Sequence, residues 1–436
     1  MNSAAAKQTT TPPLAWWREP TKAQWMAFLA AWAGWVLDAF DFTIYLIVVP
    51  EIAKEFGVST TAALGSLTLT LMVRLLGGVA AGWMADRWGR KLPLMLALLW
   101  FAVFDGLVAL APSFTWVLVL RTLFGFGMGA EWTAGSTLAM ENWPKRSRGI
   151  ASGLLQGSWA IGFLLAALIS AVVVPLWGWR GLFVVAIAPA LLALPIRIWV
   201  PESEEWRKQR RAEAGKQVSL ARAGVLGKLI GASVVMGLGF AVYYGLTTSY
   251  TAMLASQFGM AADQRWQLLV LFNLGMLVGA VGCGWAARKY GVRVAVALPA
   301  LLVIPALPLY VGMVPGLLWL GAVLGGMLGV GFCGVVPMVL TEVCPAQVRA
   351  RCVGIAYHAG AVMAAFVAPA VPWLAGRASI SMGTSILLIA GGFELLLAVC
   401  LLLLPGERAA NAGADAVDPA DGDGDGDGEA EAEVAA

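Results

Sequence analysis

Charged side chains in the middle of long apolar stretches are the residues of this chain that could do chemistry. Asp38 and Asp41 lie three positions apart in the first stretch, so they share one face of a helix. Arg74 lies at a similar depth in the second stretch. A charge at the centre of a bilayer costs about 2.5–3.5 kcal/mol on insertion scales, which makes each of them a candidate for function. Because neighbouring carboxylates favour protonation of one of them, we expect proton coupling here; the alternative is a static ion pair between the two helices.

The fourth apolar stretch carries two further charges, Arg121 and, ten residues later, Glu131. An arginine that faces a cavity can bind a carboxylate through two parallel hydrogen bonds, so Arg121 is a candidate for holding an anionic substrate. The alternative is an ion pair with Asp105 in the third stretch. Glu131 is a candidate proton-coupling residue, and its alternatives are hydrogen bonds to its own helix or a pair with Arg148.

Polar groups at membrane depth are fewer in the second half of the chain. Hydroxyl and amide groups suit recognition of an oxygen-rich acid, and these candidate substrate-binding residues are Tyr243, Tyr244, Thr247, Thr248 and Asn273. His358 is the only histidine and follows Arg351 by seven residues, so it is expected at a helix interface. Glu394 is expected to be a packing residue of the last helix.

A short motif between the second and third stretches combines small, acidic and basic residues. Glycine at its first position allows close helix approach, and the aspartate can accept bonds from a neighbouring helix N-terminus or an arginine. Retention of positive charge on one side of a membrane explains the basic residues but leaves the Gly and Asp spacing unexplained. The motif therefore predicts a gating latch, with the residues Gly82, Asp86, Arg87, Gly89 and Arg90.

The composition shows what must position these residues. The chain has 436 residues, of which 60% are hydrophobic and 13% charged, whereas soluble domains carry about 25% charged residues. Its solvent is therefore expected to be lipid, which excludes a secreted protein, a nucleic-acid-binding domain and a large soluble catalytic domain. The 5 cysteines show no CxxC spacing, so neither a disulfide framework nor a metal site is expected.

Short polar breaks divide the apolar sequence into twelve predicted spans, six on each side of a polar segment. The predicted organisation is an N-terminal segment, a first six-helix bundle, a linker, a second six-helix bundle and an acidic tail, at residues 1–24, 25–200, 201–228, 229–405 and 406–436. An excess of Lys and Arg predicts cytoplasmic termini, with 22 on that side against 4 in the outer loops.

The two halves repeat one another. The octapeptide at 82–89, GWMADRWG, matches GWAARKYG at 284–291, an offset of 202 residues. A second match relates Glu141 to Glu342, each followed three residues later by proline, at an offset of 201. Two matches at nearly one offset indicate a duplicated six-helix unit, and such repeats place a substrate path between the halves.

These features resemble the major facilitator superfamily over about residues 25–405. The resemblance rests on the motif at 82–91, the duplicated halves and the Pro-Glu-Ser stop at 201–203. Residues 37–42, LDAFDF, are similar to the D-G-F-D signature of proton-coupled organic-acid permeases, with Ala39 at the usual glycine. Residues 129–132, GAEW, with ENWPK at 141–145, are similar to helix 4 of the sialate:proton symporter family, which contains sialic-acid and lactate permeases.

The resemblance implies an all-α membrane protein with twelve transmembrane helices and the major facilitator fold of two pseudo-symmetric six-helix bundles. It implies alternating-access import of a small carboxylic acid with protons across a bacterial-type inner membrane. The expected partners are the acid, protons and the lipid bilayer, with no nucleic acid, no cofactor beyond the proton gradient and a monomeric chain. The alternatives are a sialic-acid-specific or aromatic-acid symporter, a non-transporting nutrient sensor and an efflux antiporter, which the absent Gly-Pro-x-x-Gly-Gly stretch in helix 5 disfavours.

Overall fold

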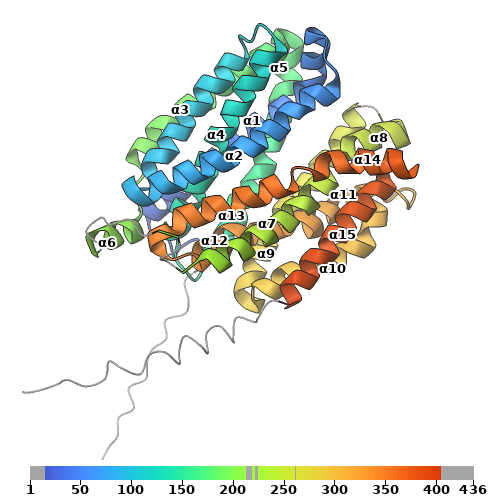
Figure 1. The fold of residues 1–436 in the computed structure, drawn as a ribbon. Helices are drawn as coiled ribbons and strands as arrows, with labels where there is room; N and C mark the ends of the chain where they lie inside the picture. The colour runs from blue at the N-terminus through green and yellow to red at the C-terminus, as the bar shows by residue number, and fades with distance from the viewer. Residues whose placement is uncertain (1–14, 213–218, 221–223, 261, 404–436) are drawn as a thin grey trace, which may run out of the picture.

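The computed structural model describes residues 15–212, 219–220, 224–260 and 262–403, and these residues are almost entirely helical (Figure 1). The acidic tail at 406–436, residues 213–218 and 221–223 of the predicted linker and most of the N-terminal segment lie outside the described residues. The fold is the predicted all-helical membrane architecture of two bundles.

The N-terminal bundle has six spans in five labelled helices. Its helices are α1 (Lys22–Phe56), α2 (Thr60–Trp88), α3 (Lys91–Val108), α4 (Phe114–Asn142) and α5 (Arg148–Trp199). The chain reverses within α5 at Gly178, whose φ of 66° and ψ of −174° are non-helical, so α5 supplies two spans. This left-handed position is one that glycine adopts without steric cost. The short helix α6 (Glu204–Ala212) follows.

The C-terminal bundle also has six spans, several of them interrupted. Its helices are α7 (Leu226–Thr247), α8 (Tyr250–Phe258), α9 (Ala262–Tyr290), α10 (Val292–Tyr310), α11 (Leu318–Leu324), α12 (Val336–Val343), α13 (Arg349–Ala364), α14 (Val367–Ala378) and α15 (Met382–Leu403). A π-helical turn, η1 (Gly325–Val330), and a 3₁₀ turn, η2 (Gly331–Val335), join α11 to α12. We call Leu318–Val343 the broken helix, and the one-turn η3 (Ala346–Val348) follows it.

Most of these spans are long and apolar enough to be recognised as membrane-spanning from their mean hydropathy. Among the described residues, nine helical stretches are long and apolar enough to cross a membrane, and one of them, 148–188, is the stretch that turns at Gly178. The helices α1 and α4 are not among the nine, and each carries buried charges. The buried charges lower the mean hydropathy of α1 and α4, and these charged side chains must be accommodated by the packing of neighbouring helices.

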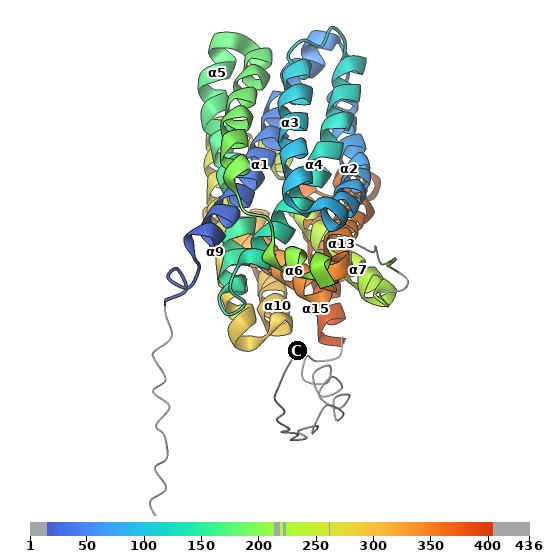
Figure 2. The ribbon, with the colours of Figure 1, turned by 90° about the vertical axis from the view of Figure 1, so that its left-hand side faces the viewer.

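The most extensive contacts between the bundles are made by two helix pairs: α2 packs against α13, and α5 packs against α9 (Figure 2). A Cβ added to Gly149 would lie 2.2 Å from the carbonyl oxygen of Gly284, and one added to Gly284 would lie 2.1 Å from that of Gly149. Gly82, the counterpart of Gly284 in the repeat, would place a Cβ 2.7 Å from Cα of Arg351 on α13. Both copies of the repeated glycine thus permit backbone contact between the halves.

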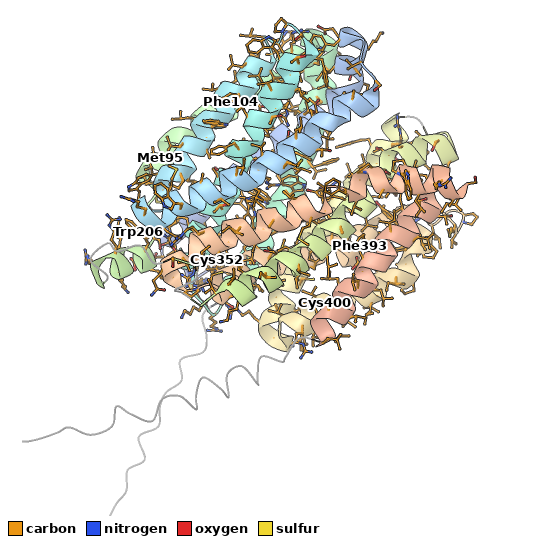
Figure 3. All side chains as sticks on the ribbon, viewed as in Figure 1. Met95, Phe104, Trp206, Cys352, Phe393 and Cys400 are labelled. Atoms are coloured by element: carbon orange, nitrogen blue, oxygen red, sulfur yellow. The ribbon has the colours of Figure 1, made fainter. Side chains whose placement is uncertain are left out.

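The end of the molecule that carries the 82–91 motif and α6 is the end predicted to face the cytoplasm, and we call it the inner end. Figure 1 shows α6 beside the adjoining ends of α2 and α3. Trp206, labelled on α6 in Figure 3, donates a hydrogen bond from its indole nitrogen to the carbonyl of Asp86 at 3.0 Å. The helix α6 is therefore packed against the predicted latch.

Candidate functional site

A cavity lies between the two bundles. Its lining is mostly aromatic and apolar, and among the described residues Arg74 is the one charged side chain in it. The lining residues are Trp35, Phe42, Leu71, Arg74, Gln156, Trp159, Met236, Gly239, Phe240, Tyr243, Tyr244, Met276, Val330, Phe332, Cys333, Val336 and Tyr357. These residues come from both halves, as the repeat predicts for a substrate path.

Arg74 is buried but incompletely paired. Its Nη2 lies 3.9 Å from Oδ2 of Asp38, a loose ion pair, and its Nε and Nη2 make no hydrogen bond. The guanidinium carbon lies 5.6 Å from the Trp35 ring centroid and 5.5 Å from that of Tyr357. A cation held between aromatic faces, with unused donors in a cavity, is a binding group for a carboxylate.

Asp38 is completely buried, and neither of its carboxyl oxygens accepts a hydrogen bond. Asp41 lies close enough to Asp105 for the two carboxyls to interact electrostatically. The bundle thus encloses at least these three carboxyls around two guanidiniums, those of Arg74 and Arg121. Burial strongly disfavours an unpaired charge, so the excess of carboxyls over guanidiniums makes this cluster a candidate for binding a proton.

Arg121 pairs with Asp105, the alternative partner considered from the sequence. Its Nη1 lies 2.9 Å from Oδ1 of Asp105, and its guanidinium carbon lies 4.7 Å and 4.2 Å from the ring centroids of Tyr45 and Phe124. Arg121 is fully buried and is not part of the cavity lining. Glu131 is also buried outside the lining, one residue before Trp132, whose ring stacks on Tyr357 at 3.4 Å.

The predicted substrate residues of the C-terminal half divide into two groups. Tyr243 and Tyr244 line the cavity, and Tyr243 accepts a hydrogen bond from the Trp159 indole at 3.1 Å. Thr247 and Thr248 instead donate their hydroxyls to the carbonyls of Tyr243 and Tyr244, at 2.7 and 2.6 Å. Asn273 donates to Leu269. Such bonds to the preceding turn satisfy a hydroxyl locally, and these three side chains lie outside the lining.

Most of the aromatic residues that line the cavity, which we call the aromatic wall, were not among the residues predicted from the sequence. Trp35 and Phe42 lie on the same face of α1 as Asp38, and Met236, Gly239, Phe240 and Tyr243 follow the three- and four-residue spacing of one face of α7. That spacing was a usable signal, but only the packing of the halves shows which face meets the cavity. His358 lies at a helix interface as expected, and this interface is between the halves, with Nε2 3.1 Å from the carbonyl of Gly129 on α4.

The predicted latch is closed in this structure. The carboxylate of Asp86 accepts hydrogen bonds from the backbone N–H groups of Ala350 and Arg351, at 3.1 and 3.2 Å, and from Nε of Arg351 at 2.9 Å. Ala350 and Arg351 belong to the first turn of α13, where unpaired N–H groups favour an anion. Gly82, one turn earlier, permits the required contact.

Arg90 extends the latch to α4. It donates from Nε and Nη2 to Glu141 at 3.0 and 2.8 Å, and Arg349 of the other half lies 3.2 Å from the same carboxylate. Burial alone would raise the pKa of Glu141, but the two guanidiniums hold the pKa of that carboxyl below its ordinary value. Gly89, with a φ of 100°, brings the backbone against Glu202, whose carboxylate accepts the Arg90 N–H at 2.9 Å.

Arg87 differs from the other motif residues. Its guanidinium carbon lies 5.5 and 5.7 Å from the ring centroids of Trp83 and Trp88, which are exposed side chains at the inner end of α2. Arg87 therefore lies among exposed rings, whereas Gly82, Asp86 and Arg90 contact the opposing elements. Together the latch contacts hold the inner end closed.

Removing the latch carboxylate should open the inner end. We expect Asp86→Ala, in a chain that retains Cys352 as its sole cysteine, to raise the rate of maleimide labelling of Cys352 about tenfold, because the buried charge-assisted bonds to α13 are lost. Cys352 is fully buried beside the latch (Figure 3). Glu55→Gln, which removes an ion pair with Arg180 at the other end, is the matched control and should leave the rate unchanged. Equal labelling of Asp86→Ala and the parent would contradict the latch.

Comparison with known proteins adds independent findings. A model of the Major Facilitator Superfamily matches residues 31–339. The sialic acid transporter NanX of Escherichia coli is 28% identical over 389 residues, which are 88% of this chain and 95% of that protein. The cis,cis-muconate transport protein of Acinetobacter baylyi is 31% identical over 373 residues, 82% of this chain and 89% of that protein.

A solved structure of the proton:xylose symporter XylE bound to 6-bromo-6-deoxy-D-glucose shares the fold. Its TM-score is 0.73 at 19% sequence identity, over 88% of this chain and 96% of that chain. At this identity the likeness concerns the arrangement of the helices.

Proposed function

Because this chain belongs to the major facilitator superfamily, it is a multi-pass membrane transporter and not an enzyme, and we propose that it imports a small organic acid together with protons. The two relatives, named for sialic acid and cis,cis-muconate, support an organic-acid substrate. The observation that carries the proposal is the buried, incompletely paired guanidinium of Arg74 in a cavity between the halves.

Arg74 is proposed to bind the substrate carboxylate. The sequence favoured Arg121 for this role, but Arg121 is engaged by Asp105 outside the cavity lining, whereas Arg74 has free donors within it. A carboxylate can accept two parallel hydrogen bonds from a guanidinium. Trp35 and Tyr357, which flank that guanidinium, would contact the body of the acid next to its carboxylate.

The aromatic wall favours a flat, unsaturated acid over a polyhydroxylated one. Eight lining residues are aromatic: Trp35, Phe42, Trp159, Phe240, Tyr243, Tyr244, Phe332 and Tyr357. A stacked aromatic pair contributes about 0.5–1.5 kcal/mol beyond its buried area. The hydroxyls of a sugar acid would need many polar partners, and buried hydroxyls without partners lose affinity.

Proton coupling is proposed to arise from competition for Arg74. When Asp38 is ionised, it attracts Arg74 and opposes binding of an anion. A proton on Asp38 removes that competitor, so the substrate carboxylate can pair with Arg74 while the site stays electrically neutral. After the cytoplasmic side opens, loss of the proton restores the Asp38–Arg74 pair and expels the acid. Asp41 and Asp105, which lie close to one another, are proposed to pass the proton to Asp38 from the outer half.

Uptake into proteoliposomes tests this function. With an inward proton gradient, we expect benzoate or cis,cis-muconate to accumulate about tenfold more than sialate or lactate, because only the flat acids use the aromatic wall. One control is the same vesicles with the proton gradient collapsed, in which accumulation should disappear. The other is protein-free liposomes under the same gradient, because a protonated monocarboxylic acid crosses a bilayer unaided and only accumulation above that level belongs to the protein. Preferential accumulation of sialate would contradict the aromatic-wall argument, and accumulation of none of the four acids would contradict organic-acid import.

A further inference from the structure

Glu394 is a buried carboxyl in the C-terminal bundle that the transport cycle described above does not use. It lies on α15, next to Phe393 (Figure 3), and is 0% exposed. Neither carboxyl oxygen has a hydrogen-bond partner, and no ion pair to it is found among the described residues. Its surroundings are apolar: a Cβ built on Gly329 would lie 3.1 Å from Oε1 of Glu394, 2.8 Å from Leu246 and 3.4 Å from Val303.

No cation faces Glu394 from the described parts of the helices packed against α15, which are α7, α8, α10 and α14. Arg293 of α10 is bonded to the carbonyls of Leu401 and Leu402 at the inner end, and Arg377 of α14 lies in the last turn of its helix. The other titratable side chains on these helices are Lys228 in the first turn of α7 and the tyrosines Tyr243, Tyr244, Tyr250 and Tyr310. An ionised carboxylate with no partner in such a place would be very costly, so Glu394 carries a proton in this conformation.

The carboxyl borders the most irregular part of the molecule. Gly329 belongs to η1, the π-helical turn of the broken helix, and the 3₁₀ turn η2 follows it. Single π-helical turns inside longer helices occur frequently at functional sites. A Cβ on Gly326 would lie 2.0 Å from the carbonyl oxygen of Phe272, and one on Gly334 would lie 1.9 Å from that of Ala280, so this segment packs directly on the backbone of α9.

The broken helix runs from the surroundings of Glu394 to the contacts that close the inner end. Its last segment, α12, contains Glu342 in its final turn, and this carboxylate lies 3.7 Å from Arg148 of the N-terminal bundle and also pairs with Arg288. Opening of the inner end must break the contact between Glu342 and Arg148 and move α12. A rearrangement of η1 and η2 during that movement would change the surroundings of Glu394.

We propose that Glu394 is a second proton-binding site, located in the C-terminal bundle, which holds its proton while the inner end is closed and releases it to cytoplasmic water when the broken helix moves. The proposal rests on the proton-coupled import described above, and it assigns two protons to each substrate. One proton is carried by Asp38 and the other by Glu394. The release step is a simple ionisation, in which the carboxylic acid becomes a carboxylate and water takes the proton.

The number of protons carried per substrate tests the inference. Purified full-length protein is reconstituted into liposomes, and the membrane potential is clamped at zero with potassium and valinomycin. Accumulation of cis,cis-muconate, whose two carboxylates hinder unaided passage through the bilayer, is then measured against the imposed pH difference, with protein-free liposomes as the background. The logarithm of the accumulation ratio then rises with a slope equal to the number of protons. We expect a slope of about two for the wild type and about one for Glu394→Gln. Glutamine matches the size of a protonated glutamate and cannot ionise, so folding should be preserved.

Two further readouts separate proton binding from a packing role. Glu394→Asp keeps an ionisable carboxyl and should retain the slope of the wild type. An infrared spectrum of the wild type should show the carbonyl stretch of a protonated carboxyl that is missing from Glu394→Gln. Equal, nonzero slopes for the wild type and Glu394→Gln would overturn the second site and leave the proposed import intact. A wild-type slope of zero would overturn the proposed import itself, and the second site with it.

Discussion

Arg74→Gln should lower the affinity for the transported acid about 100-fold and reduce uptake to background. The substrate carboxylate loses a buried, charge-assisted partner, and truncating one member of such a pair costs about 2–5 kcal/mol. No other charged side chain of the described residues lines the cavity to replace it. Arg74→Lys should recover part of the affinity, because lysine keeps the charge but lacks the planar fork that binds a carboxylate with two parallel bonds.

Arg121→Gln is the matched comparison, since it also removes a buried guanidinium from the N-terminal bundle. Binding of radiolabelled acid to the purified protein, followed by scintillation proximity, isolates affinity from the later transport steps. We expect Arg121→Gln to bind within about threefold of the wild type, because Arg121 lies outside the cavity lining and pairs with Asp105. If Arg121→Gln loses binding and Arg74→Gln retains it, the carboxylate site belongs to Arg121, as the sequence alone favoured.

The fold was predictable from the sequence because its determinants are local. Twelve apolar stretches, separated by short polar breaks, require a bundle of spanning helices, and the match between 82–89 and 284–291 indicates two repeated halves. The interruptions were harder to predict. The π-helical turn at 325–330 depends on glycines whose close contacts are with α9, an element distant in sequence. The fifth and sixth predicted spans both lie within α5, because the chain reverses at Gly178 without a connecting loop.

The candidate site was predictable only in part. Charged residues at membrane depth are conspicuous in a sequence, so Asp38, Asp41, Arg74 and Arg121 could be selected without a structure. Their partners depend on how helices rotate against one another, and no local pattern determines that rotation. The sequence therefore left both fates of Arg121 open. The structure pairs it with Asp105.

Whether a buried carboxyl lacks a hydrogen-bond or ion-pair partner also depends on elements distant in sequence. Glu394 reads as an ordinary packing residue in the sequence, since nothing nearby along the chain shows that α7, α10 and η1 enclose it with apolar groups. The hydroxyls of Thr247 and Thr248 show the opposite case. They suggest binding groups in the sequence, but each is satisfied by the carbonyl one turn earlier on its own helix.

Asp38→Asn should separate binding from energy coupling. Asparagine resembles the protonated aspartate, so Arg74 would be permanently free to pair with the acid. We expect affinity equal to or higher than that of the wild type at about pH 8, and no change in affinity between about pH 5.5 and 8, a range in which a typical carboxylic acid substrate stays ionised. In the wild type, affinity should rise as the pH falls, because a proton on Asp38 removes the competitor for Arg74.

Transport by the same variant should retain exchange and lose the part of the accumulation that the Asp38 proton drives. Exchange of external labelled acid for internal unlabelled acid needs no net proton movement, so Asp38→Asn should support it at close to the wild-type rate. Accumulation driven by a proton gradient should fall to the level that the single proton of Glu394 supports, because the substituted amide cannot release a proton to restore the ion pair with Arg74 on the cytoplasmic side. Both assays use the same proteoliposomes, which makes their ratio independent of how much protein is reconstituted.

Asp41→Asn tests whether the effects of Asp38→Asn are specific to the carboxyl next to Arg74. Asp41 lies on the same helix face but interacts with Asp105 rather than Arg74, so its replacement should slow proton delivery while leaving substrate affinity dependent on pH. Gradient-driven accumulation by Asp38→Asn at the wild-type level would show that the proton is carried elsewhere. Loss of the pH dependence of binding in Asp41→Asn alone would move the competing carboxylate from Asp38 to Asp41. Because the loose contact of Arg74 is with Asp38, at 3.9 Å, we expect the pH dependence to disappear with Asp38.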